Sequence, residues 1–142
     1  MSAPKTRFLA LLLVAAFAAT SCGDNNDTPI APATPAQSVV ENFSGTLTPF
    51  SARTHIFTSN NAGDVIVQIT ALDPSDSIVG LSVGTSNTFA CQSSGVATEQ
   101  ATLNSSLSGV TRAAGTLCVH IYDPSETGLP GPVTYTVQVT HF

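Results

Sequence analysis

The 142-residue sequence contains little charge and few large aromatic side chains: 9% of its residues are charged, Trp is missing and Tyr occurs only twice. Charged residues usually form about a quarter of a globular chain. Four Lys and Arg stand against nine Asp and Glu, which gives a formal net charge of −5. Because nucleic-acid binding needs a clustered positive surface that displaces counterions, this balance argues against a nucleic-acid partner.

The sequence also offers little for catalysis. It contains no His-Glu-x-x-His helix, no phosphate loop and no dinucleotide fingerprint. Its three histidines, His55, His120 and His141, each stand alone in an alternating segment. A metal pair of His55 and His120 would require their strands to be adjacent and in register. We therefore expect a protein that is not an enzyme, with a small secreted hydrolase based on these histidines as the weakest alternative.

The first 21 residues have the pattern of an export signal. Lys5 and Arg7 precede an unbroken apolar run of 12 residues from Phe8 to Ala19. This length lies within the roughly 7–15 residues of a signal-peptide core and is short of the ~20 that a membrane-spanning helix needs. We predict that residues 1–21 form a signal peptide that is removed on export.

The end of this signal, Ala19-Thr20-Ser21-Cys22, resembles a bacterial lipobox. The resemblance implies that Cys22 is diacylated, becomes the new N-terminus and anchors the protein to a membrane. Ala19 departs from the lipobox pattern, which most often has Leu there. Cleavage by ordinary signal peptidase after small residues such as Ala18 or Thr20 therefore stays open as an alternative.

The residues behind Cys22 predict where the anchor lies and how far the domain stands from it. In lipoproteins, Asp directly after the cysteine can mark inner-membrane retention, and here that position is Gly23, which favours the outer membrane in a cell with two membranes. Residues 22–37 have little apolar content and three regularly spaced prolines. An extended chain of this composition spans roughly 45 Å, so we predict a flexible stalk.

Residues 38–142 alternate between apolar and polar side chains, and this period of two predicts strands. Short, numerous strands bury one face each most economically in two packed layers. We therefore predict an all-β, jelly-roll-like antiparallel β-sandwich of about eight strands. The strands are expected, most clearly, at Asp64–Leu72, Gly115–Tyr122 and Val133–Phe142 and, less clearly, at Val39–Leu47, Ala52–Thr58, Ser77–Thr85, Phe89–Gln92 and Ala101–Leu107.

The alternation also assigns side chains to faces. In the strand that begins at Asp64, the predicted core positions are Val65, Val67, Ile69 and Ala71. Tyr135 falls on the apolar face of the last strand and is predicted to lie in the core. Tyr122 points away from the apolar side chains of its own strand, so it is the one candidate for an exposed aromatic platform that binds a ligand.

Three cysteines in an exported protein leave one without a partner unless it is modified. If Cys22 carries lipid, Cys91 and Cys118 form the remaining pair. A disulfide between them closes a loop of 27 residues, for which the chain-entropy model gives about 3.5 kcal/mol of stabilisation. We expect the enclosed residues 92–114 to form a long Ser- and Thr-rich loop that is otherwise poorly anchored.

Two similar tetrads, Asp73-Pro74-Ser75-Asp76 and Asp123-Pro124-Ser125-Glu126, have the pattern of type I turns. The leading Asp of each can accept hydrogen bonds from backbone N–H groups beyond it. Turn formation alone accounts for these residues. The alternative is that Asp73, Asp76, Asp123 and Glu126 supply oxygen ligands to calcium, which takes such ligands from acidic loops.

Several segments together resemble the bacterial pre-peptidase C-terminal domain family. The segments are Phe43–Leu47, Asn61–Val65, Gly80–Gly84, Ala114–Val119 and Val133–Val137. The resemblance covers about 97 residues and implies a β-sandwich; some relatives bind calcium or extracellular matrix polymers. The acidic stretch frequent in that family is reduced here to Asp73 and Asp76, so no ligand residue is carried over.

The sequence thus predicts a non-catalytic, lipid-anchored domain of the cell envelope that serves in adhesion or in binding a protein or glycan. A calcium-stabilised matrix-binding module is the first alternative. Each hypothesis places the protein outside the cytoplasm, because each depends on the export signal.

Overall fold

A computed structural model describes residues 36–87 and 90–142. The predicted signal peptide, Cys22 and residues 22–35 of the predicted stalk lie outside the described residues. Within the described ranges, no helix is long and apolar enough to cross a membrane.

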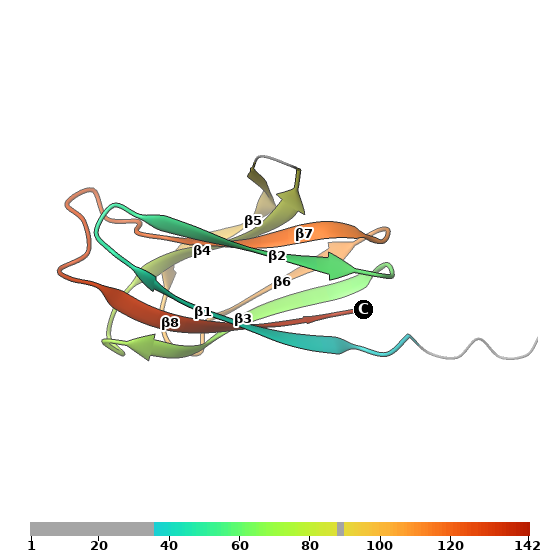
Figure 1. The fold of residues 1–142 in the computed structure, drawn as a ribbon, viewed down its shortest axis with the longest axis horizontal. Helices are drawn as coiled ribbons and strands as arrows, with labels where there is room; N and C mark the ends of the chain where they lie inside the picture. Colours follow the sequence, from blue (N-terminus) through green and yellow to red (C-terminus); the bar gives the residue numbers. More distant parts are fainter. Residues whose placement is uncertain (1–35, 88–89) are drawn as a thin grey trace, which may run out of the picture. The chain divides into compact units, whose positions relative to one another are not determined.

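Eight strands form two antiparallel sheets of four strands each (Figure 1). In the first sheet the order is β1-β8-β3-β6, and in the second it is β2-β7-β4-β5. Neighbours in a sheet are therefore mostly distant in sequence, as in the double Greek key of a jelly roll, and the predicted fold class is confirmed. The strands are β1 (Val39–Leu47), β2 (Ala52–Ser59), β3 (Gly63–Asp73), β4 (Val79–Ser86), β5 (Cys91–Ala101), β6 (Ser106–Thr111), β7 (Gly115–Tyr122) and β8 (Val133–His141).

The core lies between the two sheets and is built from the alternating apolar side chains. β8 buries every second residue, and Tyr135 is 2% exposed, so its predicted place in the core is confirmed. In β3 the alternation holds through Ile69, but a bulge then shifts the register against β8. Because the bulge inserts one residue, Leu72 turns into the core and Ala71 is exposed, and the predicted core position at Ala71 is wrong.

The segment between the two paired cysteines also differs from the prediction. β5 is eleven residues long and pairs with β4, while β6 pairs with β3, so residues 92–114 do not form a loop. The strand predicted at Ala101–Leu107 spans instead the turn between β5 and β6, where Asn104 has a φ of 66°. β5 and β6 are edge strands. Since an edge strand can turn one side to water, Ser and Thr are tolerated there, and the alternation is weak.

The disulfide Cys91–Cys118 is present, which confirms the predicted pair. It joins β5 to β7, although β4 lies between these strands in the sheet. The two Cα atoms are nevertheless only 5.8 Å apart. Gly84 of β4 pairs directly with Cys118 and has no side chain to stand between the sulfurs. The first residue of β5 therefore lies over the outer face of the second sheet and is fixed there by the disulfide.

Candidate functional site

An open cleft of about 610 Å³ lies at one end of the sandwich, and we call it the end cleft. It lies where β1 ends and β8 begins, since Leu47 pairs with Val133 and Val133 lines the cleft. Val39, at which the chain enters β1, lies at the opposite end, eight residues or about 27 Å from Leu47. The cleft is lined by the β3–β4 loop and the β7–β8 loop through Pro74, Asp76, Ser77, Ile78, Ser125, Thr127, Gly128, Leu129, Pro130, Gly131, Pro132 and Val133.

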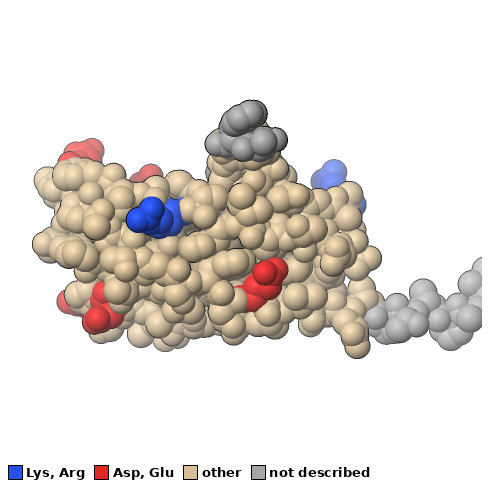
Figure 2. Space-filling view, in the orientation of Figure 1, with Lys and Arg blue, Asp and Glu red and all other residues tan. Residues whose placement is uncertain are grey.

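The walls of the end cleft expose apolar side chains. Ile78 is 49% exposed. Phe50, in the β1–β2 turn, is 71% exposed, and its ring lies against Gly128. Gly128 has a φ of 81°, and a Cβ there would lie 2.8 Å from the ring, so this position requires glycine. Ring and loop together form an apolar rim beside the cleft. Figure 2 shows that most of the drawn face of the domain carries neither Lys or Arg nor Asp or Glu.

Asp123 ties the loops around the cleft together. Its Oδ2 accepts hydrogen bonds of 2.8 Å from the backbone N–H groups of Phe50 and Leu129, and its Oδ1 accepts one of 2.9 Å from Ser125. Its own backbone N–H donates to the carbonyl oxygen of Ser51 at 3.0 Å. Partial burial raises the pKa of Asp123, but the three backbone hydrogen bonds outweigh it, and the net pKa is lowered. Asp123 therefore anchors the β7–β8 loop to the β1–β2 turn.

The two acidic tetrads lie at this same end, but their turns begin later than predicted. The backbone turn in the first tetrad is closed by Ser77 N–H donating to Pro74, and that in the second by Gly128 N–H donating to Ser125. In the second tetrad the Asp123 carboxylate instead accepts a hydrogen bond from the N–H of Ser125. Asp76 lines the end cleft.

No metal centre is assembled from these acids in the described part of the chain. No three His, Cys, Asp or Glu side chains there form a group that could hold a metal ion. The four candidate ligands are Asp73, Asp76, Asp123 and Glu126. Both oxygens of Asp123 already accept backbone hydrogen bonds, whereas Glu126 is exposed. Calcium binding by these residues stays a prediction without a preformed site.

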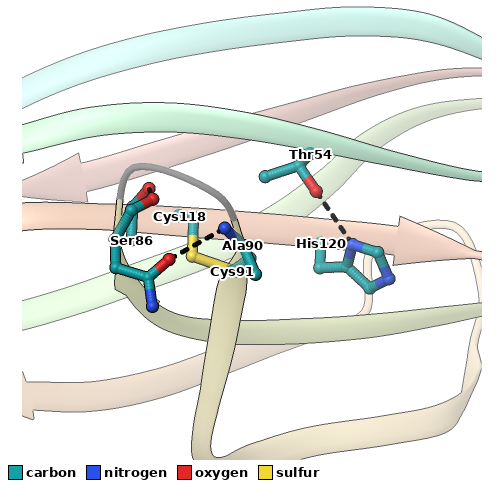
Figure 3. Close-up of a disulfide and its surroundings, with 7 residues drawn as sticks. Thr54, Ser86, Ala90, Cys91, Cys118 and His120 are labelled. Atoms are coloured by element: carbon teal, nitrogen blue, oxygen red, sulfur yellow. Dashed lines mark hydrogen bonds between the residues drawn. A yellow bond between two sulfur atoms is a disulfide. The ribbon is translucent and has the colours of Figure 1, made fainter.

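Tyr122 and His120 lie side by side on the outer face of the second sheet, because the apolar residues that alternate with them in β7 face the core. Their rings are stacked, with centroids 5.4 Å apart and planes 29° apart. His120 Nδ1 is 3.0 Å from Thr54 Oγ1, a hydrogen bond that holds the imidazole toward β2 (Figure 3). Burial lowers the pKa of His120. This placement agrees with the prediction that Tyr122 lies away from the core.

His55 belongs to a different environment. It alternates with Thr54 in β2 and points toward the first sheet, where its Nε2 and Tyr135 Oη share a 2.8 Å hydrogen bond and its ring stacks on Phe43. Burial, and to a smaller degree Arg53, lower the pKa of His55. β2 and β7 are adjacent, but Thr54, not His55, pairs with His120. The two histidines therefore face opposite sides of the sheet, and they do not form a metal pair.

The third histidine, His141, is 1% exposed at the end of β8. Its Nε2 contacts Glu41 Oε1 at 2.8 Å, and its ring packs on Phe57. Its Nδ1 is buried without a hydrogen-bond partner. This hydrogen bond joins the first strand to the last, a structural role that the alternating pattern could not reveal.

One sequence feature resembles a hydrolase motif: residues 80–84 match Gly-x-Ser-x-Gly. In hydrolases this pattern needs a sharp strand-to-helix turn that exposes the serine. Here Ser82 lies within β4 and is 5% exposed. It is paired in register with His120, but no hydrogen bond joins the two side chains, and His120 Nδ1 is engaged by Thr54. The described residues thus hold no nucleophile elbow at Ser82.

No protein-family model matches this chain. No curated protein matches it in sequence. Among solved structures, the chain is similar to the crystal structure of Aeromonas hydrophila PliG, a periplasmic lysozyme inhibitor of g-type lysozyme. The TM-score is 0.47 and the sequence identity 16%, over 70% of this chain and 83% of that chain. A likeness of this size assigns no partner to this chain, and the resemblance to the pre-peptidase C-terminal domain family stays a prediction.

Proposed function

We propose that the protein is a non-catalytic, lipid-anchored domain of the cell envelope that binds a partner protein through the end cleft. The observation that carries the proposal is the position of this cleft. It opens at the Leu47–Val133 end of the sandwich, whereas the chain enters the domain at Val39. A domain tethered through Cys22 would present such a cleft away from the membrane.

The construction of the cleft supports a binding role. Loops mounted on a rigid scaffold are common binding surfaces, because the scaffold fixes their ends and the side chains remain accessible. Here the loops are fixed by Asp123 and by the packing of Phe50 on Gly128. Phe50 and Ile78 are large apolar side chains that are exposed to water, which does not stabilise the isolated domain. Apolar side chains of a partner protein could bury them and so contribute to binding.

Charge indicates the chemistry of the partner. Asp76 lines the cleft, and Asp73 and Glu126 lie in the same two loops. The two arginines of the described residues, Arg53 and Arg112, do not line it. An apolar surface bordered by carboxylates is complementary to a segment that carries apolar side chains beside Lys or Arg.

Export is supported by the disulfide, since such bonds persist in oxidising compartments. The anchor is tested by fractionating cells that express the wild type or the Cys22→Ser variant. The wild-type protein should sediment with membranes and the variant should not. Equal partitioning of the two proteins would refute the lipid anchor.

The cleft is tested by photo-crosslinking in intact cells. A photoreactive residue at Thr127, which is exposed and lines the cleft, should give one dominant adduct. The matched control is Thr58, which is exposed on β2 and does not line the cleft. The adduct should be absent at Thr58 and should disappear from Thr127 when Ile78→Asp is added. Equal adducts at both positions, or an adduct that survives Ile78→Asp, would refute the proposal.

A further inference from the structure

The outer face of the second sheet holds a second surface, centred on Tyr122. Gly80 of β4 pairs with Tyr122, and a Cβ on Gly80 would lie 2.3 Å from ring atoms Cε2 and Cζ. The tyrosine ring therefore lies over the backbone of β4 and is possible only because residue 80 is glycine. One side of the ring rests on the sheet and the other side is turned away from it.

His120 lies next to this ring. Its ring is stacked beside that of Tyr122 at 5.4 Å, and its Nδ1 is fixed by Thr54, so that Nε2 is left for another partner. Burial lowers the pKa of His120, which favours the neutral imidazole. The two rings form a strip along β7 that ends at the Cys91–Cys118 disulfide, beside which the close-up places His120 (Figure 3).

The strip is bordered by uncharged side chains on β2 and β4, including Ile56, which pairs with Cys118 and is 57% exposed. On β4 the outward positions after Gly80 are Ser82 and Gly84, both buried. The carboxylate of Glu99, on β5, lies close enough to Tyr122 to raise the pKa of its phenol, after the larger effect of burial. No cation accompanies it among the described residues of this face: Arg53 alternates with Thr54 and so faces the other side of β2, and Arg112 lies in the β6–β7 turn.

We propose that Tyr122 and His120 form a stacking platform for a glycan of neutral sugars. A pyranose ring offers one face of C–H groups, which packs on an aromatic ring, and a rim of hydroxyls, which needs hydrogen-bond partners. Here Glu99 and His120 Nε2 supply partners next to the rings. A uronate or a sulfated sugar would meet the Glu99 carboxylate with no compensating cation. This inference shares with the proposed function the premise of a binding domain, but it concerns a different surface.

The test is calorimetric titration of the full chain in detergent with three probes of equal length: cellotetraose, N-acetylchitotetraose and tetragalacturonate. At least one of the two neutral probes should bind, and tetragalacturonate should bind at least tenfold more weakly. Binding should also shift the NMR ring signals of Tyr122 and not those of buried Tyr135, the second tyrosine of the chain. No binding of either neutral probe, or equal binding of tetragalacturonate, would overturn the inference.

Variants assign the binding to the platform. Tyr122→Ala should lower the affinity at least tenfold, whereas Tyr122→Phe should keep most of it because the ring remains. Val110→Ala removes an exposed apolar side chain on β6 of the other sheet and should change nothing. Gly80→Ala should displace the ring and weaken binding, while its control Gly115→Ala, whose Cβ meets nothing within 4 Å, should not.

Melting temperatures of all variants show whether the fold is kept. If Tyr122→Ala fails to fold, Gly80→Ala decides the question in its place. Binding that survives both substitutions would overturn the platform. If no glycan binds at Tyr122 but the Thr127 crosslink is observed, the platform is refuted and the proposed function is retained. If a glycan binds at Tyr122 but no Thr127 crosslink is observed, the proposed function is refuted and the platform is retained.

Discussion

Replacing Asp123 by Ala removes the group that fastens the β7–β8 loop to the β1–β2 turn. Three backbone N–H groups, those of Phe50, Ser125 and Leu129, lose their acceptor. Hydrogen bonds to a charged group contribute about 1.5–3 kcal/mol each when the partners are shielded from water. Asp123 is only partly buried, so water can replace part of this loss. We expect Asp123→Ala to lower the free energy of unfolding by roughly 2–3 kcal/mol.

For a domain of this size, such a loss corresponds to a melting temperature lower by roughly 10–15 °C, measurable by circular dichroism. The matched control is Asp73→Ala, which changes the leading Asp of the other tetrad. Among the described residues, Asp73 accepts no backbone hydrogen bond, so its removal should shift the melting temperature by only a few degrees. Equal shifts for the two variants would refute the role that the geometry gives to Asp123.

The pH dependence gives a second measurement on the same group. The pKa of Asp123 is lowered below its ordinary value of 3.8, so the folded state binds the proton less readily than the unfolded state. Its contribution to stability is therefore complete above pH 3.8 and is lost as the pH falls through the lowered pKa. The stability curves of wild type and Asp123→Asn should converge in acid. Curves that stay parallel below pH 3.8 would contradict this assignment.

Four further predictions concern the rest of the domain. Reduction of the disulfide, or the double substitution Cys91→Ser and Cys118→Ser, should lower the free energy of unfolding by about 3.5 kcal/mol at most, and denaturant titration with an unchanged midpoint would contradict the loop-closure argument. Tyr135→Phe removes a hydrogen bond between the sheets and should cost about 1–2 kcal/mol in the same titration. Because the pKa of His55 is lowered, the neutral form stabilises the fold, so the melting temperature should fall as the pH drops below 6.5, less steeply in His55→Gln; identical slopes would refute this. A calcium chelator should leave the melting temperature unchanged, since no group of ligands is assembled in the described residues, and a fall of several degrees would favour the calcium hypothesis.

Period-two alternation was sufficient to predict the eight-stranded sandwich, the buried position of Tyr135 and the outward position of Tyr122. It failed at Ala71, because a bulge in β3 depends on how β8 pairs with it, and pairing is not visible in one strand. It also failed for β5, which is an edge strand and can therefore carry polar residues that break the alternation. In both places the pairing with a neighbouring strand, and not the local pattern, determined which residues form the strand and which face the core.

The candidate functional residues were likewise predicted only in part from the sequence. Sequence singled out Tyr122 and the two acidic tetrads as unusual residues, but it could not show that Gly80 lies beneath the tyrosine ring or that His120 lies beside it. Nor could it show that His55 and His120 face opposite sides of one sheet, since this follows from the pairing of β2 with β7. The sequence predicted that the Asp123 carboxylate accepts hydrogen bonds from backbone N–H groups beyond it, but it could not show that the N–H of Phe50, 73 positions earlier, also donates to it.

The sequence by itself determined the fold class and the cysteine pair, because alternation and cysteine number are properties of the chain alone. The tertiary structure decided which loops meet: Ile78 and Leu129 line one cleft because β3 pairs with β8 and β4 pairs with β7, which brings the β3–β4 and β7–β8 loops to the same end of the sandwich. Strand order arises from the competition among all pairings of eight similar strands, and no single strand carries enough information to fix it.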